Sequence, residues 1–117
     1  MRYLGFIKPA HEYGDPPRAL QDAMNGYVQE QLASGHVVET GGMAPTSQTI
    51  HVKLANSRLS VTDGPFTEAK EVTGGYAIME YGSKGEAIEG MRTFLELHRT
   101  HWPEFEGECE LRELYKM

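Results

Sequence analysis

The order of elements in this chain depends on the stretch Val61-Thr-Asp-Gly-Pro-Phe-Thr-Glu-Ala-Lys-Glu-Val-Thr-Gly-Gly-Tyr76. Apolar alternation ends just before this loop and starts again just after it, which predicts two β-strands joined by a turn. Asp63, Gly64 and Pro65 form the turn signal. The Asp side chain can accept a hydrogen bond from a backbone N–H of the turn, glycine has a free φ, and proline fixes φ.

The rest of this loop predicts a polar notch at one end of a sheet. A strand that restarts on Gly74 and Gly75 allows another backbone to approach closely. Asp63 in such a notch is placed to move a proton as a catalytic acid or base. The alternative is that Asp63 only holds the turn, with Gly64 and Pro65. The candidate ligand-binding residues around it are Phe66, Glu68, Lys70 and Tyr76, with Ser47 from the preceding loop.

Composition predicts a cytoplasmic protein with one domain, residues 1–117. The hydrophobic content of 39% is slightly lean for a monomer of this size, which leaves room for a partner subunit. The net charge of −6 disfavours nucleic acid and anionic membrane surfaces as partners. No apolar run is long enough for a transmembrane helix. The lone Cys109 excludes an internal disulfide, fits a reducing compartment and is interpreted as a small strand hydrophobe.

Two helices are predicted, each with start and stop signals. The first has Asp15 as its N-cap, proline at its first helical position, and Gly35 in the left-handed conformation after its end. The second opens on a capping box, in which Ser83 accepts the N–H of Glu86 and Glu86 reaches back. Pro103 prevents this helix from continuing.

The strands are predicted at residues 2–7, 36–40, 49–55, 59–62, 75–81 and 108–115. Residues 49–55 and 59–62 form a hairpin that turns at Asn56-Ser57. Its apolar residues Ile50, Val52, Leu54, Leu59 and Val61 are expected to point inward. The strands at 2–7 and 75–81 are apolar on both faces, which is typical of strands covered on both sides.

The order β-α-β, hairpin, β-α-β predicts an α+β fold: a ferredoxin-like sandwich with an extra β-hairpin, whose antiparallel sheet has two helices on one face. The other face of the sheet then needs a second cover. Two sheets packed face to face across a homodimer would provide it.

Several chemistries are disfavoured by what the sequence lacks. His98 and His101 lie at helical spacing, but two ligands do not make a zinc site, so no metal is expected. There is no nucleophile elbow, phosphate loop or dinucleotide fingerprint. We therefore expect no cofactor, and the expected partners are a second copy of the chain and a small-molecule ligand.

The loop motif also carries a resemblance to a known family. Asp63-Gly64-Pro65-Phe66, Thr67-Glu68-Ala69-Lys70-Glu71 and Gly74-Gly75-Tyr76 resemble the signature of the DGPF proteins, a branch of the YCII-related family. The tail from His98 to Arg112 is similar to the ending of a subset of these proteins. The likeness extends over nearly the whole chain, starting from Arg2-Tyr3-Leu4.

The resemblance implies a dimeric α/β-barrel and two kinds of function. One is a cofactor-free enzyme similar to lactone isomerases or dehalogenases, in which Asp63 transfers a proton on a small organic acid. The alternative is a non-catalytic homodimer that binds a small ligand or a regulatory partner, since some DGPF proteins are linked to sigma-factor systems. A third reading is a dimer in which the motif serves folding alone.

One feature of the relatives does not carry over to this chain. YCII-type relatives have a catalytic pair, a His in the first helix and an Asp after the second. Here no His lies between Arg18 and Ser34, and the later segment reads Leu95-Glu-Leu-His-Arg99. These positions therefore disfavour an inherited His–Asp mechanism, and only the region around Asp63 carries over.

Overall fold

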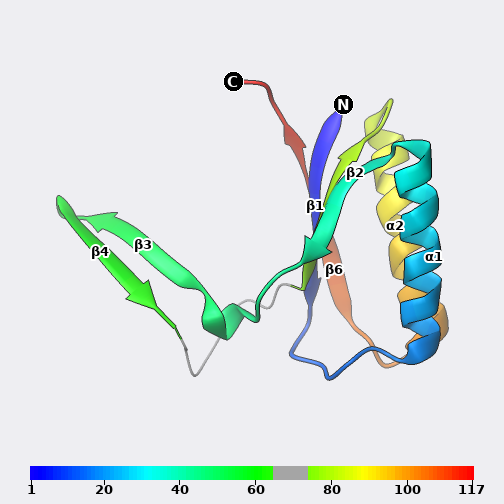
Figure 1. The fold of residues 1–117 in the computed structure, drawn as a ribbon, viewed down its shortest axis with the longest axis horizontal. Helices are drawn as coiled ribbons and strands as arrows, with labels where there is room; N and C mark the ends of the chain where they lie inside the picture. The colour runs from blue at the N-terminus through cyan, green and yellow to red at the C-terminus, as the bar shows by residue number, and fades with distance from the viewer. Residues whose placement is uncertain (65–73) are drawn as a thin grey trace.

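The computed structural model describes residues 1–64 and 74–117 and shows two helices, a four-stranded sheet and a separate hairpin (Figure 1). Pro65, Phe66, Glu68 and Lys70 lie outside the described residues. The elements are β1 (Arg2–Pro9), α1 (Arg18–Ser34), β2 (Val37–Gly42), the 3-10 helix η1 (Thr46–Gln48), β3 (Ile50–Ala55), β4 (Arg58–Asp63), β5 (Gly75–Glu80), α2 (Lys84–His101) and β6 (Gly107–Leu114). This confirms the α+β class with antiparallel sheets, consistent with a ferredoxin-like fold.

The four-stranded sheet has the strand order β2-β5-β1-β6, and every neighbouring pair is antiparallel. Both helices lie on the same side of this sheet (Figure 1). Tyr3 lies opposite Met79, and Gly5 lies opposite Ala77. A Cβ at Gly5 would lie 3.4 Å from the Sδ of Met91 in α2, so these residues face the helices. The core between the sheet and the helices forms on this face.

The opposite side of the sheet, which we call the open face, carries alternate residues of the same strands. Leu4 pairs with Ile78 and Phe6 pairs with Tyr76, so these four apolar side chains share one surface. All four are partly exposed. No element among residues 1–64 and 74–117 covers this surface as the helices cover the other. The strands predicted to be apolar on both faces thus have one face covered.

Helix α1 begins later than the sequence predicts. Its N-cap is Pro17, in an extended conformation with φ −55° and ψ 148°, and no side chain caps the helix. The predicted Asp15 cap is therefore wrong. The reason is the second proline: a residue before proline is pushed out of the helical region, so Pro16 cannot be the first helical residue. The predicted end is confirmed, because Gly35 has φ 82° and its N–H bonds the Leu32 carbonyl.

The capping box of α2 is confirmed in its first half. The N–H of Glu86 donates to the Ser83 hydroxyl at 3.2 Å. The Glu86 carboxylate reaches back one residue further than predicted, where it accepts the N–H of Gly82 at 3.0 Å. Two backbone donors are still satisfied at this helix start, which is what a capping box contributes.

The hairpin forms as predicted, but its apolar side chains do not point into a core. Asn56 and Ser57 have φ values of 52° and 61°, as a two-residue turn of type I′ requires. The two strands make a sheet of their own, which stands apart from the helices and the main sheet (Figure 1). The expectation that the apolar face is inward is wrong, because every residue of β3 and β4 is exposed. Alternation distinguishes two faces of a strand but does not show what covers either of them.

Two helix glycines predict opposite effects of substitution by alanine. A Cβ at Gly90 in α2 would overlap the hydroxyl of Tyr81 and lie 3.0 Å from its Cζ, whereas nothing lies within 4 Å of a Cβ at Gly26 in α1. We expect Gly26→Ala to raise the free energy of unfolding by about 1 kcal/mol through helix propensity. We expect Gly90→Ala to lower it by about 1–3 kcal/mol, because Tyr81 is buried and cannot move freely.

Urea unfolding of the two variants and the parent measures whether each substitution raises or lowers the free energy of unfolding. A gain in stability for Gly90→Ala would show that Tyr81 yields without cost, and that α2 is not held against the end of β5 as tightly as the geometry indicates.

Candidate functional site

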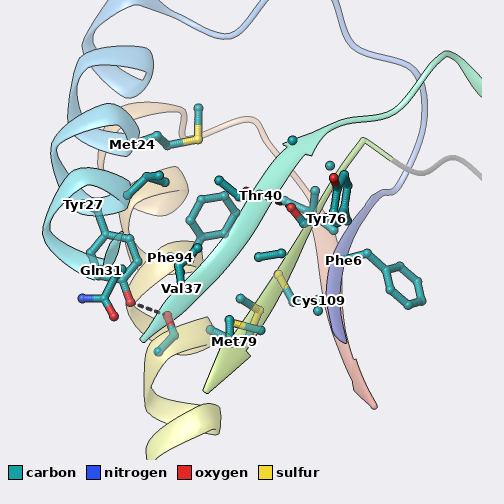
Figure 2. Close-up of a pocket in the computed structure, with 18 of the residues that line it drawn as sticks. Phe6, Met24, Tyr27, Gln31, Val37, Thr40, Tyr76, Met79, Phe94 and Cys109 are labelled. Atoms are coloured by element: carbon teal, nitrogen blue, oxygen red, sulfur yellow. Dashed lines mark hydrogen bonds between the residues drawn. The ribbon is translucent and has the colours of Figure 1, made fainter. Parts of the chain in front are cut away.

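A cavity of about 390 Å³ lies between the two helices and the sheet (Figure 2). Its floor consists of small residues. Gly5, Gly75 and Ala77 lie on the face of the sheet that meets the helices, together with Gly42, which pairs with Gly75. A Cβ at Gly42 would meet no atom within 4 Å, so space is left there, whereas the end of the Met79 side chain lies over Gly5. The apolar side chains around the space are Met24, Val28, Val37, Met79, Met91 and Phe94.

Among residues 1–64 and 74–117, none of those that line the cavity is charged. The Tyr27 hydroxyl donates to the Gly90 carbonyl at 2.9 Å, and burial raises the pKa of Tyr27 to about 12. The Thr40 hydroxyl donates to the Tyr76 carbonyl at 2.8 Å. Burial, with a smaller effect from Glu108, raises the pKa of the Cys109 thiol to about 11. These groups are neutral at pH 7, so the cavity favours an uncharged and largely apolar occupant.

The residue predicted as the catalytic acid or base lies elsewhere in the described structure. Asp63 is the last residue of β4, opposite Ile50, and it is exposed. It is not among the residues that line the cavity. Ser47 is half-buried in η1, at the base of the hairpin. Gly64 follows Asp63 and is half-buried.

Tyr76 borders the cavity, but its ring points away from it. Phe6 and Tyr76 are directed to the open face (Figure 2). The Tyr76 hydroxyl donates to Glu39 Oε2 at 3.1 Å, and this hydrogen bond is the main cause of a raised pKa of Tyr76. The ring lies over Gly41, where a Cβ would be 3.1 Å from the Tyr76 Cε1. A ligand would therefore contact the Tyr76 ring, as predicted, from the open face of the sheet.

Gly74 and Gly75 bring three backbone segments together at the end of the sheet. The N–H of Gly74 donates to the Ile7 carbonyl at 3.0 Å, and its carbonyl accepts the N–H of Met43 at 3.0 Å. A Cβ at Gly75 would lie 3.2 Å from the carbonyl oxygen of Gly41. The glycine pair is thus placed where backbones approach closely, as its sequence position predicts.

The sequence interpretation missed the helix residues that border the cavity. Met24, Tyr27 and Val28 belong to the apolar stripe of α1, and Met91 and Phe94 belong to that of α2, which helical spacing marks simply as core. The available signal was the run of small residues on the strands opposite them. A strand position with glycine where a core residue is expected indicates missing volume above the sheet.

No group of three or more possible metal-ligating side chains occurs in residues 1–64 and 74–117. His98, one of the two helix histidines considered as ligands, is buried at the end of α2. Its Nδ1–H donates to the Phe94 carbonyl at 3.0 Å, and its ring lies 4.7 Å from that of Phe105. Among the described helices, none is both long and apolar enough to cross a membrane.

The environment of His98 predicts a pH dependence of stability. Burial lowers the pKa of His98 below its ordinary value, and the hydrogen bond to Phe94 offsets this only in part. The unfolded state then binds more protons than the folded state at pH values between the folded pKa and about 6.5. The contribution of His98 is therefore complete above about pH 6.5 and declines as the pH falls through that range.

The variant His98→Asn isolates this effect, because its amide can still donate to the Phe94 carbonyl but does not titrate. We expect urea unfolding between about pH 5 and 7.5 to show a weaker pH dependence in His98→Asn than in the parent. Equal slopes in the two proteins would show that His98 is accessible to protons in the folded state.

Comparison with known proteins places the chain in a family. The family described as YCII-related domain matches residues 1–93, which is more than half of the chain. No curated protein matches the chain. The matched residues include α1, the glycine-rich end of β2, the hairpin and β5, so they carry most of the cavity wall.

Proposed function

Because this chain belongs to the YCII-related family and has a cavity between its helices and its sheet whose described lining is uncharged, we propose that it binds a small apolar molecule there and acts as a homodimer. The cavity carries this proposal. Its volume of about 390 Å³ lies within the usual range of sites for small organic ligands. Its apolar wall with a few polar groups is also typical of such sites.

The chemistry of the wall narrows the class of ligand. Met24, Met91 and Phe94 offer polarisable and aromatic surface, which suits a ring or a short hydrocarbon chain. The Tyr27 and Thr40 hydroxyls already donate to backbone carbonyls, so each offers a ligand its oxygen as an acceptor. A molecule with one hydroxyl or amine donor on an apolar body fits this arrangement. Among the lining residues that the structure describes, a carboxylate would find no cationic partner, so its desolvation would be costly.

The homodimer is supported by the open face of the sheet. Leu4, Phe6 and Ile78 form an apolar surface on strands whose other face is covered by the helices. Two such surfaces packed together would produce a dimeric α/β-barrel. We also propose that the chain belongs to the DGPF branch of the family. This branch implies a regulatory role beside sigma-factor systems.

Proton transfer by Asp63 on a small organic acid is the other function that the sequence predicts. It has less support, because Asp63 is exposed on the hairpin and no described residue of the cavity wall carries a charge that would hold an acid. It stays a prediction that the same experiment can test.

Binding of the neutral fluorescent probe N-phenyl-1-naphthylamine tests the cavity. Ala77 lies on the cavity floor, facing the helices, so Ala77→Leu places a larger side chain in the space. We expect the parent to bind the probe and Ala77→Leu to bind it at least about tenfold more weakly, since the added methylene groups occupy the site. Asp63→Asn, which keeps a turn acceptor but loses the charge, should bind the probe like the parent.

Each departure from this result has a defined meaning. Failure of the parent to bind, or equal binding by a folded Ala77→Leu, would overturn the proposal. Loss of binding in Asp63→Asn would bring the Asp63 carboxylate into the ligand site and favour the enzyme. Thermal unfolding of each variant shows whether it is folded at the assay temperature.

A further inference from the structure

The face of the hairpin that carries its aliphatic side chains is fully exposed. In β3 and β4, Val52 lies opposite Val61 and Leu54 lies opposite Leu59, so these side chains share one face with Ile50. Their exposed fractions run from 61% for Ile50 to 77% for Leu59. We call this surface, made of Ile50, Val52, Leu54, Leu59 and Val61, the arm face. The opposite face of the hairpin carries polar residues such as Lys53, Ser60 and Thr62.

The hairpin does not close onto its own chain. The radius of gyration is 16.2 Å, whereas a compact chain of this length has about 13 Å. Figure 1 accounts for the excess, because the hairpin extends from the body as a separate two-stranded sheet. A two-stranded hairpin is at best marginally stable alone in water. An amphipathic hairpin of this kind therefore gains most of its stability when its apolar face is covered.

The area of the arm face is large enough to support a stable contact. Five side chains exposed to this degree present on the order of 600 Å² of apolar surface, the upper end for the largest patch on a typical monomer. Two arms, with the surfaces that they cover, would bury on the order of 2,000 Å² in total. Specific and stable protein interfaces have this size.

The direction of the hairpin indicates which molecule covers it. In Figure 1 the helices lie at one end of the longest axis and the hairpin at the other, with the main sheet between them. The hairpin thus extends on the side of the sheet opposite the helices, where the open face lies. A second copy that packs on the open face would lie beside the hairpin, and two-fold symmetry would place its own hairpin beside the first chain.

We propose that the β3–β4 hairpin is an arm whose apolar face packs against a second copy of this chain. The arm extends the dimer of the proposed function beyond the open face, so this inference rests on that dimer. Each protomer holds its partner with the same residues, as a closed two-fold contact requires.

The test compares two pairs of lysine substitutions on opposite faces of the same hairpin. Val52→Lys with Leu59→Lys places two charges on the arm face, and Ser60→Lys with Thr62→Lys places the same charges on the polar face. Sedimentation equilibrium gives the dimer dissociation constant of each protein. We expect a dimeric parent, a dissociation constant raised at least about 100-fold by the first pair, and a change of less than about threefold from the second.

The outcomes distinguish the arm from the dimer and from the ligand site. Equal dimer dissociation constants for the parent and for both lysine pairs would overturn the arm. A dimer formed through the open face alone would then remain. A parent that is monomeric at all concentrations would overturn both the arm and the dimer. This holds even if a different protein covers the hairpin. Binding of N-phenyl-1-naphthylamine by the monomeric arm-face variant would show that the ligand site stands independently of the arm.

A milder variant keeps the test decisive if the lysine pair disrupts the hairpin. Val52→Thr with Val61→Thr retains β-branched side chains of nearly the same shape and removes apolar surface from the arm face. It should weaken dimerisation in the same direction by a smaller factor. An unchanged dissociation constant in this variant would count against the arm.

Discussion

Shortening Met79 to alanine is expected to lower the free energy of unfolding by about 2–5 kcal/mol. Met79 is only 1% exposed and lies in the central strand pair of the sheet, opposite Tyr3 of β1 and Val37 of β2. All three belong to the core between the sheet and the helices. Removal of the side chain therefore leaves a void in the core between the sheet and the helices, and the loss combines transfer and cavity terms.

The same substitution should change ligand binding, because Met79 also lines the cavity. Met79→Ala enlarges the space, so we expect it to bind probes longer than N-phenyl-1-naphthylamine that the parent excludes. Leu20→Ala is the matched control: Leu20 is fully buried but does not line the cavity. It should lose comparable stability, measured by urea unfolding, and keep the binding preference of the parent.

A result in which both alanine variants lose stability and neither changes the size of the bound probe would contradict the assignment of the cavity as the ligand site. If Met79→Ala lost no stability, the core between sheet and helices would already be loosely packed around Met79, and the cavity would not be a formed site.

The local elements could be predicted from the sequence because their signals are local. The Gly35 helix end and the Asn56-Ser57 turn depend on backbone conformations that few residue types adopt. Asp15 failed as a cap because two consecutive prolines keep the chain extended until Pro17. Such competition between neighbouring signals is visible in the sequence, but its outcome depends on which backbone restriction is stronger.

The cavity and the exposed hairpin could not be predicted because they depend on contacts between elements. The alternation of Val52 and Leu54 shows that one face of the strand is apolar, and the inward direction assumed a cover that the described chain does not supply. Gly5 and Ala77 lie far apart in sequence, and only strand pairing places them on the same floor. The catalytic expectation for Asp63 came from a loop motif, and motifs of this kind identify a family more directly than a reaction.

Replacement of Trp102 by alanine is expected to lower the free energy of unfolding by about 3–5 kcal/mol, in the same range as the largest core truncations. Trp102 is 9% exposed and follows the last turn of α2. Its ring centroid lies 5.0 Å from that of Tyr13 in an edge-on arrangement and 5.3 Å from that of Phe105. Its Nε1–H donates to Glu104 Oε1 at 2.9 Å.

This cluster joins the loop before α1 to the distant segment between the end of α2 and the start of β6. Tyr13 belongs to the loop before α1, and its hydroxyl accepts the N–H of Glu106, just before β6, at 2.9 Å. Removing the indole leaves Tyr13 without one of the rings that pack against it, so both the start of α1 and the start of β6 should lose order. Circular dichroism is the appropriate measurement, because Trp102 is the only tryptophan in the chain and its fluorescence is lost in the variant.

Trp102→Phe separates the packing of the ring from its hydrogen bond. Phenylalanine keeps an aromatic ring beside Tyr13 but cannot donate to Glu104, so we expect it to lose about 1–2 kcal/mol, less than alanine does. Since Trp102 does not line the cavity, neither variant should change probe binding while it is folded. Equal losses for the two variants would show that the hydrogen bond and indole shape, rather than aromatic packing, hold the end of α2. The contact between the loop before α1, the end of α2 and β6 would then depend on this hydrogen bond more than on ring packing.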